Sequence, residues 1–214
     1  MPQVYLVRHG ETEWNVQRRI QGQSDSPLTE NGKHQARLLA HRLSLAGITH
    51  ILTSDLGRAQ HTAEIIATRC GNKIIKDQRL RELHMGVLED RRLATLSEKE
   101  EQWQQQMVNG SPEARIPGGE SMQEMATRMQ EMLANCLEFP AESKLLLVSH
   151  GLALGCLLGT LLGLPANAAR RLRLRNCSLS MIDYQQSAWL ASGWVVETTG
   201  DTAHLDIPVF DQKK

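Results

Sequence analysis

The sequence Val4-Tyr5-Leu6-Val7-Arg8-His9-Gly10 decides the fold prediction, because a run of apolar residues passes directly into residues that can carry chemistry. Consecutive apolar residues are typical of a strand that is buried on both faces of a mainly parallel sheet. Ligands of such sheets bind beyond the carboxyl ends of the strands. We therefore expect Arg8 and His9 to lie at a ligand-binding edge of the sheet.

The same succession of residues occurs twice more along the chain. Ile51-Leu52-Thr53 predicts a strand that leads into the polar residues 54–58, and Leu145-Leu146-Leu147-Val148 predicts a strand that leads into Ser149-His150-Gly151. Each predicted strand therefore delivers polar groups at its carboxyl end. We expect the three ends to converge on one site.

Apolar periodicity predicts helices between these strands. Helical spacing covers residues 29–46 and 56–70, and an apolar stretch of helical length follows Gly151. Two capping-box pairs, Ser97 with Glu100 and Ser121 with Glu124, predict two further helix starts. The remaining predicted elements are a short basic helix opened by Pro165 and strands at 73–76, 178–184 and 189–197.

Alternating strands and helices predict an α/β fold, specifically a three-layer αβα sandwich with a mainly parallel central sheet. A chain of 214 residues is within the range of one domain, so we expect a single domain over residues 1–214. The polar region at about 84–118 is rich in glycine and proline at its borders. We expect it to be a lid-like insertion.

The composition argues against several classes of protein. The 24 basic and 24 acidic residues give no net charge, so no bulk field attracts nucleic acid or a membrane surface. The four cysteines form no C-x-x-C pair, which argues against a zinc site and a disulfide framework. Residues 145–164 carry no charge, but a buried strand and a buried helix explain them without a membrane span. We expect a cytoplasmic protein.

The polar residues at the three strand ends suit a phosphate dianion. A guanidinium group binds two phosphate oxygens at once, and a histidine followed by glycine lies where the backbone can approach a ligand closely. Arg8, Arg58, His9 and His150 together would form such a pocket.

These residues resemble those of the histidine phosphatase superfamily, in its cofactor-dependent phosphoglycerate mutase branch. The resemblance spans residues 3 to about 180. It is carried by Leu6-Val7-Arg8-His9-Gly10-Glu11-Thr12, Asn15, Gln21-Gly22, Asp25-Ser26-Pro27-Leu28-Thr29, Ser54-Asp55-Leu56-Gly57-Arg58-Ala59, Thr62, Arg81-Glu82, Pro117-Gly118-Gly119-Glu120-Ser121 and Val148-Ser149-His150-Gly151. The resemblance implies a phosphoglycerate mutase-like fold and an enzyme that transfers phosphoryl groups through a phosphohistidine.

The resemblance also implies a role for each matching residue. His9 is the expected nucleophile, Arg8, Arg58 and His150 are expected to bind the phosphoryl oxygens, and Glu82 is expected to supply the proton. Glu89 is a nearby rival for the proton-donor role. The family's pocket further suggests three donors near the phosphate, namely Asn15, Gln21 and Gly22. Backbone amides of Gly151 and Leu152 at a predicted helix N-terminus fit anion binding as well.

Departures from the family pattern affect the choice between hydrolysis and mutase activity. The motif after the proton donor often ends in Trp-Glu-Gly in the family, whereas here Leu88-Glu89-Asp90 stands in its place. Dedicated mutases resemble longer chains that have a basic pair in the insertion to clamp the glycerate carboxylate. Arg91-Arg92 or Arg115 could replace that pair, but the short insertion is acidic at Glu98, Glu100 and Glu101. We therefore favour phosphatase activity over interconversion of 2- and 3-phosphoglycerate.

The expected partner is a small phosphorylated metabolite, with no nucleic acid and no membrane; the oligomeric state is unknown. Hydrolysis requires no cofactor, whereas a mutase would need 2,3-bisphosphoglycerate as a primer, and no metal is expected. Two alternatives remain. A metallohydrolase could use His9, His150 and Glu82 as ligands, and a silent phospho-ligand sensor would keep the arginines without catalysis.

Overall fold

The computed structural model describes residues 2–186 and 193–205 and contains a six-stranded sheet with the order β3-β2-β4-β1-β5-β6. The strands are β1 (Gln3–Arg8), β2 (His50–Thr53), β3 (Ile74–Lys76), β4 (Lys144–Ser149), β5 (Leu179–Gln185) and β6 (Gly193–Asp201). The pairs β1–β4, β4–β2 and β2–β3 are parallel, whereas β5 is antiparallel to both β1 and β6. The predicted α/β fold with a mainly parallel sheet is confirmed.

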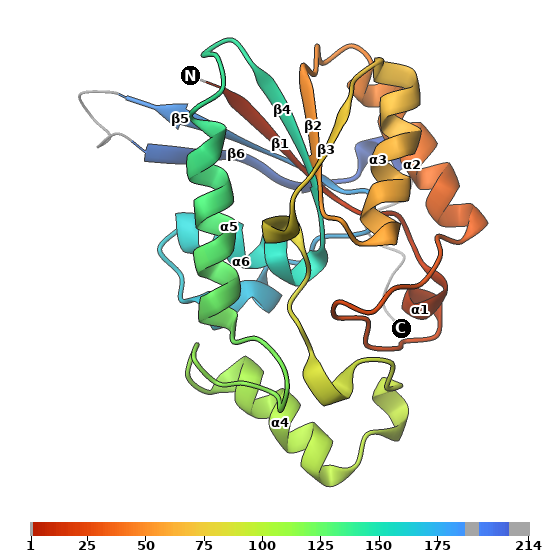
Figure 1. Ribbon diagram of the computed structural model, residues 1–214, viewed down its shortest axis with the longest axis vertical. Helices are drawn as coiled ribbons and strands as arrows, with labels where there is room; N and C mark the ends of the chain where they lie inside the picture. The colour runs from red at the N-terminus through yellow and green to blue at the C-terminus, as the bar shows by residue number, and fades with distance from the viewer. Residues whose placement is uncertain (1, 187–192, 206–214) are drawn as a thin grey trace.

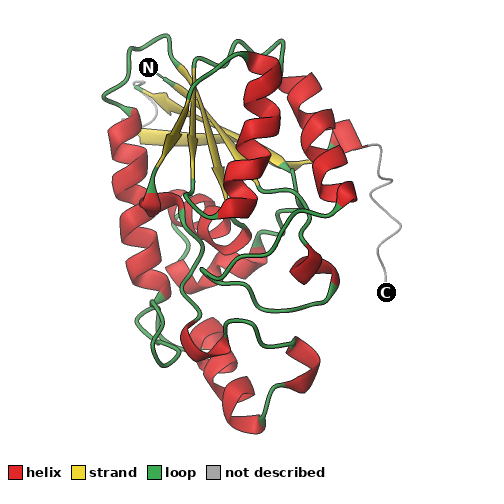
Figure 2. Ribbon diagram, turned by 45° about the vertical axis from the view of Figure 1, so that its right-hand side comes forward, coloured by secondary structure: helices red, strands yellow, loops and turns green. Residues whose placement is uncertain are grey.

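Helices cover both faces of the sheet (Figures 1 and 2). One face carries α2 (Glu30–Leu43) and α3 (Gly57–Cys70), and the other carries α5 (Met122–Cys136) and α6 (Gly151–Leu161). The predicted three layers are therefore present, with the sheet in the middle.

The position of β4 in the middle of the sheet explains why its apolar run is continuous. Leu145 and Leu147 belong to the core cluster that contains α5 and α6, whereas Leu146 and Val148 belong to the cluster that contains α2 and α3. Because successive side chains of a strand point to opposite faces, a strand buried on both sides must be apolar throughout. Each fully buried leucine stabilises the fold by roughly 1.5–3 kcal/mol.

Both capping-box predictions are confirmed. The side chain of Ser97 accepts from the backbone of Glu100 at the start of α4 (Glu98–Asn109), and Ser121 accepts from Glu124 at the start of α5. In each pair the glutamate carboxylate in turn accepts a hydrogen bond from the backbone amide of the serine. These bonds fix where both helices begin, because they satisfy amides that have no partner within the helix.

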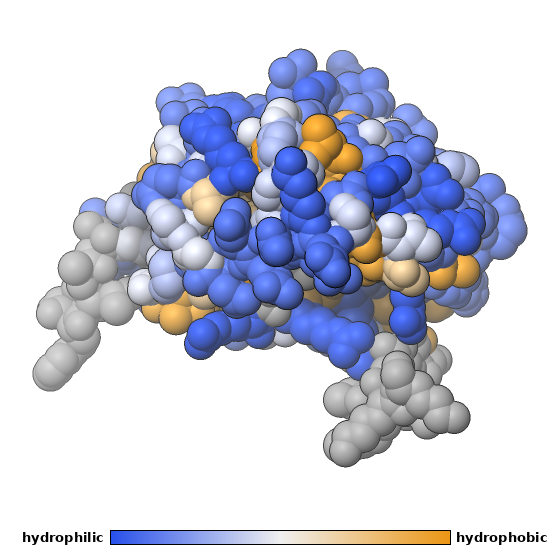
Figure 3. Space-filling view, turned by 90° about the horizontal axis from the view of Figure 1, so that it is seen from below, coloured by the Kyte–Doolittle hydropathy of each residue, from blue (hydrophilic) through white to orange (hydrophobic). Residues whose placement is uncertain are grey.

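The insertion, residues 84–118, lies beyond the carboxyl ends of the central strands (Figure 1). It contains two short 3₁₀ helices, Gly86–Leu88 and Leu93–Thr95, followed by α4. Figure 3 views this end of the molecule and shows hydrophilic residues over most of the face, with hydrophobic residues in small separate patches. Its role as a lid stays a prediction.

Several elements differ from the sequence prediction, among them the unpredicted 3₁₀ helices Gln78–Leu80 and Ala203–Leu205. A four-residue helix, α1 (Glu13–Val16), was not predicted, because it is too short to show an apolar period. The predicted basic helix after Pro165 is a 3₁₀ helix, Ala166–Arg171. The last strand, predicted over 189–197, continues to Asp201, and residues 187–192 lie outside the described part.

The apolar stretch 145–164 is divided between β4 and α6, as predicted. No described helix has the length and apolarity needed to cross a membrane. Cys70, Cys136, Cys156 and Cys177 are free thiols.

Candidate active site

A cavity of about 350 Å³ opens at the carboxyl edge of the sheet, below β1. Its lining residues come mainly from the end of β1, the N-terminus of α3, the loop after α1 and the insertion. Predicted site residues that line it are Arg8, His9, Asn15, Gln21, Gly22, Arg58, Glu82 and Leu152. Lining residues that were not predicted are Trp14, Arg18, Arg19, Ile20, Met85, Leu93 and Gln104.

His9 is buried, with 3% of its surface exposed, and its ring orientation is fixed by the backbone. The Nδ1 atom lies 2.8 Å from the carbonyl oxygen of Gly10. Since a carbonyl can only accept, we assign the proton to Nδ1, which leaves Nε2 with a free lone pair. Burial lowers the pKa of His9 well below its usual value, and the charges of Arg58 and Arg8 lower it further. The imidazole is therefore neutral and able to attack an electrophile.

Arg58 is almost fully buried and is anchored by the loop that follows α1. Its Nη2 donates to the carbonyl of Gly22 at 2.7 Å, and its Nη1 donates to the carbonyl of Ser24 at 2.8 Å and to Asp25 Oδ1 at 3.0 Å. The buried Nε has no partner within the described residues. Burial lowers the pKa of Arg58, although Asp25 opposes this shift.

Arg8 is anchored from the opposite end of the chain. Its Nη1 donates to the carbonyl of Leu174 at 2.7 Å. As in Arg58, the Nε is buried and lacks a partner in the part of the chain that the structure describes. Burial lowers the pKa of Arg8, and the charge of Glu82 partly restores it. The half-buried Arg8 and the buried Arg58 thus each retain a buried Nε–H for a ligand that accepts hydrogen bonds.

His150 packs against His9 but does not line the cavity. The two ring centroids are 5.1 Å apart, and the Nε2 of His150 lies 2.9 Å from the hydroxyl of Ser54. Its Nδ1 is buried and has no partner among the described residues. Burial lowers the pKa of His150 well below its usual value, with Arg58 as the next cause.

Glu82 faces the N-terminus of α6. Its Oε1 accepts from the backbone amides of Leu83 and Ala153, both at 3.0 Å, and its Oε2 accepts from the amide of Leu152 at 3.1 Å. The amide of Leu152, which sequence reasoning offered to an anionic ligand, is thus directed to this carboxylate. Oε2 accepts only this bond and has a further lone pair on which a proton can be held.

The polar residues after β1 complete the wall of the cavity. Asn15 Oδ1 accepts from the amide of Thr12 at 3.1 Å and from Asn176 Nδ2 at 3.2 Å, which leaves its own Nδ2 available to a ligand. Gln21 is buried, and its Oε1 has no partner in the described chain. Gly151 does not line the cavity but packs against Arg8, because a Cβ there would lie 3.3 Å from the arginine Nε.

A model of the histidine phosphatase superfamily (branch 1) matches residues 4–197. The chain belongs to this superfamily. It is 68% identical over 212 residues to a Yersinia pestis protein named probable phosphoglycerate mutase GpmB, with 99% of each chain covered. Phosphoryl transfer by an enzyme of the phosphoglycerate mutase type, on a small phosphorylated substrate, follows from this membership.

Solved structures share the fold of this superfamily member. Bacillus stearothermophilus YhfR is 31% identical, with a TM-score of 0.86 over 96% of this chain and 100% of that one. A putative alpha-ribazole-5'-P phosphatase from Escherichia coli is 28% identical, with a TM-score of 0.82 over 93% of this chain and 96% of that one.

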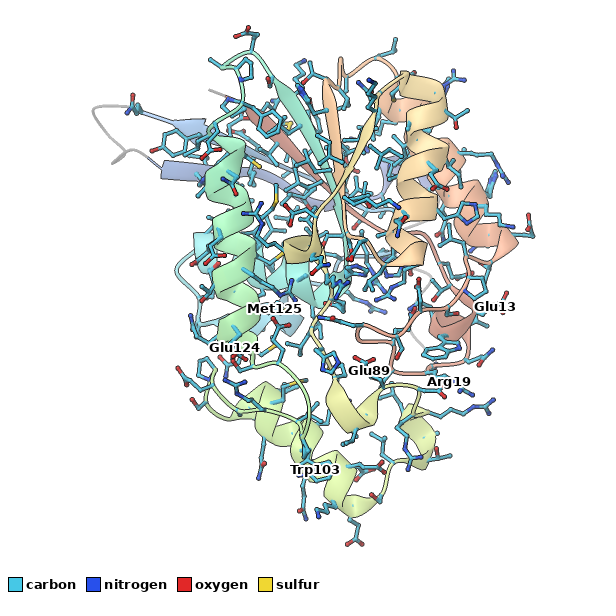
Figure 4. The ribbon with its side chains drawn as sticks, in the orientation of Figure 1. Glu13, Arg19, Glu89, Trp103, Glu124 and Met125 are labelled. Carbon is cyan, nitrogen blue, oxygen red and sulfur yellow. The ribbon has the colours of Figure 1, made fainter. Side chains whose placement is uncertain are left out.

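Glu89, the other candidate for the proton-donor role, accepts hydrogen bonds from the loop that follows Gly22. Its Oε1 accepts from the amides of Gln23 and Met85, and its Oε2 accepts from the amide and hydroxyl of Ser24. Burial raises the pKa of Glu89, but the Ser24 hydroxyl and the backbone amides outweigh it and lower the pKa overall. Figure 4 shows Glu89 and Arg19 below the carboxyl ends of the central strands.

Asp90 replaces the glycine that often ends this motif in the superfamily. It adopts a φ of +66°, a conformation that glycine reaches without strain. Aspartate is among the few other residues that tolerate it. Asp90 thus occupies a backbone conformation that glycine also adopts.

Four supporting residues of this superfamily member were not predicted as site residues. Gly10 donates to the hydroxyl of Thr62 at 3.0 Å, and Asn176 donates to the carbonyl of His9 at 3.0 Å. Asp25 and Ser54 hold Arg58 and His150, as described above. Asp25, Ser54 and Thr62 lie in the matching motifs and could have been found there, whereas Asn176 has no sequence signal.

Two of the three arginines considered as a mutase clamp form ion pairs with glutamates. Arg91 pairs with Glu100 at 2.9 Å, and Arg115 pairs with Glu124 at 2.8 Å. Arg92 is exposed, and none of the three lines the cavity. Within residues 2–186 and 193–205, no three His, Cys, Asp or Glu side chains form a group that could hold a metal ion. The geometry therefore gives the metallohydrolase alternative no support.

Proposed function

We propose that this protein hydrolyses small phosphomonoesters through a phosphohistidine at His9. The observation that carries the proposal is a neutral, buried imidazole beside Arg8 and Arg58, whose buried Nε–H groups have no partner in the described structure. A phosphoryl group is the anion that fits such a pair, because its oxygens accept several charge-assisted hydrogen bonds at once.

In the first step, the lone pair of His9 Nε2 attacks phosphorus while the bond to the ester oxygen breaks. The leaving oxygen takes a proton from Glu82, which becomes a carboxylate. Arg8 and Arg58, which line the cavity, stabilise the charge that spreads over the three equatorial oxygens, while His150 packs against the ring of His9. This charge stabilisation is the main contribution of the protein, since the transition state of phosphoryl transfer is loose.

In the second step, water attacks the phosphohistidine. Glu82 accepts a proton from this water, the bond between phosphorus and Nε2 breaks, and inorganic phosphate is released. The cycle thereby closes, with the bond between phosphorus and His9 broken and the proton that Glu82 gave in the first step replaced by one from water. No cofactor enters this cycle.

Mutase activity is the second candidate, favoured by the name of the curated relatives. A mutase would return the phosphoryl group to a phosphoglycerate and would require 2,3-bisphosphoglycerate as a primer. Arg91 and Arg115 pair with glutamates and lie outside the cavity, so neither is placed to clamp a glycerate carboxylate, which supports hydrolysis over this candidate.

The test is incubation with 3-phosphoglycerate and a panel of phosphomonoesters, without added bisphosphate, following free phosphate and 2-phosphoglycerate. We expect phosphate as the main product. Predominant 2-phosphoglycerate with little phosphate would overturn the proposal, as would loss of activity on exhaustive chelation, which would point to a metallohydrolase. No turnover at all would favour the silent sensor.

Labelling tests the nucleophile directly. With a ³²P-labelled substrate and rapid quenching, we expect an acid-labile label on the protein that is absent from His9→Asn. The matched control is His34→Asn, since His34 is an exposed histidine on α2 outside the cavity. Normal labelling of the His9 variant would refute the assignment.

A further inference from the structure

A second cavity, of about 270 Å³, adjoins the candidate active site. Arg8 and Asn15 line both cavities, so these two side chains stand between them. The other walls of the second cavity include Gln35 of α2 and the segment that precedes β5, which contributes Arg173 and Arg175. The mechanism of phosphoryl transfer uses neither of these last two arginines.

Positive charge exceeds negative charge in the second cavity. Arg8, Arg173 and Arg175 contribute three guanidinium groups, and one carboxylate, Glu11, opposes them among the described residues that line it. The Oε1 of Glu11 accepts from the hydroxyl of Thr29 at 2.8 Å. Neither Arg173 nor Arg175 forms an ion pair with any residue of the described chain. The second cavity is therefore suited to an anion.

Hydrogen-bond donors in the second cavity also lack acceptors. The Nη1 of Arg175 is buried and has no partner in residues 2–186 and 193–205. Gln35 accepts with Oε1 from the amide of Glu11 at 3.1 Å, which leaves its Nε2 to donate elsewhere. A buried N–H without an acceptor is costly, and an anionic oxygen is the strongest acceptor for a guanidinium group.

A solvated surface patch does not account for both arginines. Most arginines are exposed, and Arg173 fits that description. Arg175 differs, because it is half-buried and its Nη1 is shielded from solvent without a partner in the described structure. The buried nitrogen of Arg175 therefore points to a ligand.

The segment that carries the two arginines also holds the active site. The carbonyl of Leu174, between them, accepts from Arg8 Nη1 at 2.7 Å, and Asn176 donates to the carbonyl of His9 at 3.0 Å. Burial is the main cause that lowers the pKa of Arg8, and the charge of Arg173 is a further cause. Charge in the second cavity thus acts on a guanidinium group of the active site.

We propose that the second cavity binds a small polyanion through Arg173 and Arg175, and that this ligand weakens phosphoryl binding in the main cavity through Arg8. The polyanion carries two or more phosphate or carboxylate groups, which guanidinium groups bind by the same chemistry. Its negative charge offsets the positive charge that Arg8 offers to a phosphoryl group. Because coupling between two sites is reciprocal, a phosphoryl group weakens the polyanion by the same factor. The inference goes beyond the proposed function, since it assigns a regulatory site.

Binding is tested by calorimetry with two probes, methylenediphosphonate and tricarballylate. Each probe is titrated into the wild type and into the double variant Arg173→Gln/Arg175→Gln. For at least one probe, we expect the wild type to bind one molecule per chain more than the double variant does. The probe that shows this difference identifies the ligand groups as phosphates or carboxylates. Equal numbers of bound molecules with equal Kd values for both probes would overturn the inference.

Two further variants control for folding and for general charge. Arg173→Gln alone changes an exposed side chain, so it should keep the wild-type melting temperature while the Kd of the additional site rises at least threefold. Arg37→Gln removes an exposed arginine of α2 outside both cavities and should keep the wild-type Kd. An equal rise of Kd in Arg37→Gln would show that only the net charge matters, which contradicts a built site.

The coupling is tested by kinetics with 4-nitrophenyl phosphate and increasing amounts of the probe that binds. We expect KM to rise about fivefold to a plateau with kcat unchanged, because both ligands are bound together, and we expect the plateau to be lost in the double variant. A KM that is unchanged, that falls, or that rises without limit in both proteins overturns the inference. If turnover is absent, the proposed function fails, and the same plateau is then sought in the apparent Kd of orthovanadate.

Discussion

Asp25 holds Arg58 at two atoms. The Oδ1 of Asp25 lies 3.0 Å from the guanidinium Nη1 of Arg58 and 3.3 Å from its backbone nitrogen. Arg58 is 2% exposed, so its charge depends on this carboxylate for compensation. A residue that does not line the main cavity therefore fixes one of the two guanidinium groups that do.

Asp25→Asn should weaken this hold without removing the acceptor oxygen. Because the bond loses its charge assistance, we expect kcat/KM to fall about tenfold, or about 1.4 kcal/mol, while secondary structure is retained. Steady-state kinetics and circular dichroism measure the two effects. Asp201→Asn, which disrupts the Arg42 ion pair away from the cavity, is the matched control and should leave kcat/KM unchanged.

Replacement of Glu82 by glutamine should depend on the leaving group. A lost proton donor costs about 10²–10⁴ in rate when the departing alkoxide is a strong base, but much less for 4-nitrophenyl phosphate, whose leaving group needs no proton. The comparison variant is Glu89→Gln, which disturbs the loop around Ser24 and should slow both substrates alike. Equal losses on both substrates in Glu82→Gln would contradict the proton-donor role.

Acid should destabilise the fold through the two buried histidines. The pKa values of His9 and His150 lie well below the unfolded value of 6.5, mainly because of burial. Below pH 6.5 the unfolded chain takes up protons that the folded chain cannot, so stability is full above that pH and decreases as the pH falls. Each histidine contributes up to about 1.4 kcal/mol per pH unit.

Urea unfolding between pH 4.5 and 8 measures this dependence. In His9→Asn, the free energy of unfolding should decrease less steeply below pH 6.5 than in the wild type, because one of the two buried histidines is gone. His34→Asn should retain the wild-type slope, because His34 is exposed. A wild-type slope in the His9 variant would argue against the neutral, buried imidazole on which the nucleophile assignment depends.

Gly22→Ala should damage both stability and phosphate binding. Gly22 has a φ of +54°, and a Cβ at this position would overlap the carboxylate of Glu89. We expect a loss of about 2–4 kcal/mol in the free energy of unfolding, from backbone strain and the displaced carboxylate together. Gly71→Ala is the matched control, because Gly71 has a φ of +74° but open space around it, and should lose only about 1–2 kcal/mol.

The sequence predicted the convergence of the site because its signals there are local. The apolar runs before His9, Ser54 and His150 predict strands, and the geometry of parallel sheets brings their ends together. The anchors of these residues were not predictable in the same way. Asn176 reaches His9 from the far end of the chain, and the conformation of Arg18 depends on a bond from the insertion. Such contacts exist only once the tertiary structure has formed.

The hydrogen bonds from Arg8 to the carbonyl of Leu174 and from Asn176 to the carbonyl of His9 also bear on the order in which the site can form during synthesis. Leu174 lies 166 residues after Arg8, and Asn176 lies 167 residues after His9, so both side chains are synthesised well before the groups that hold them. A nascent chain that lacks residues 174–176 would thus leave both side chains unheld, and the candidate site would be assembled only once β5 pairs with β1.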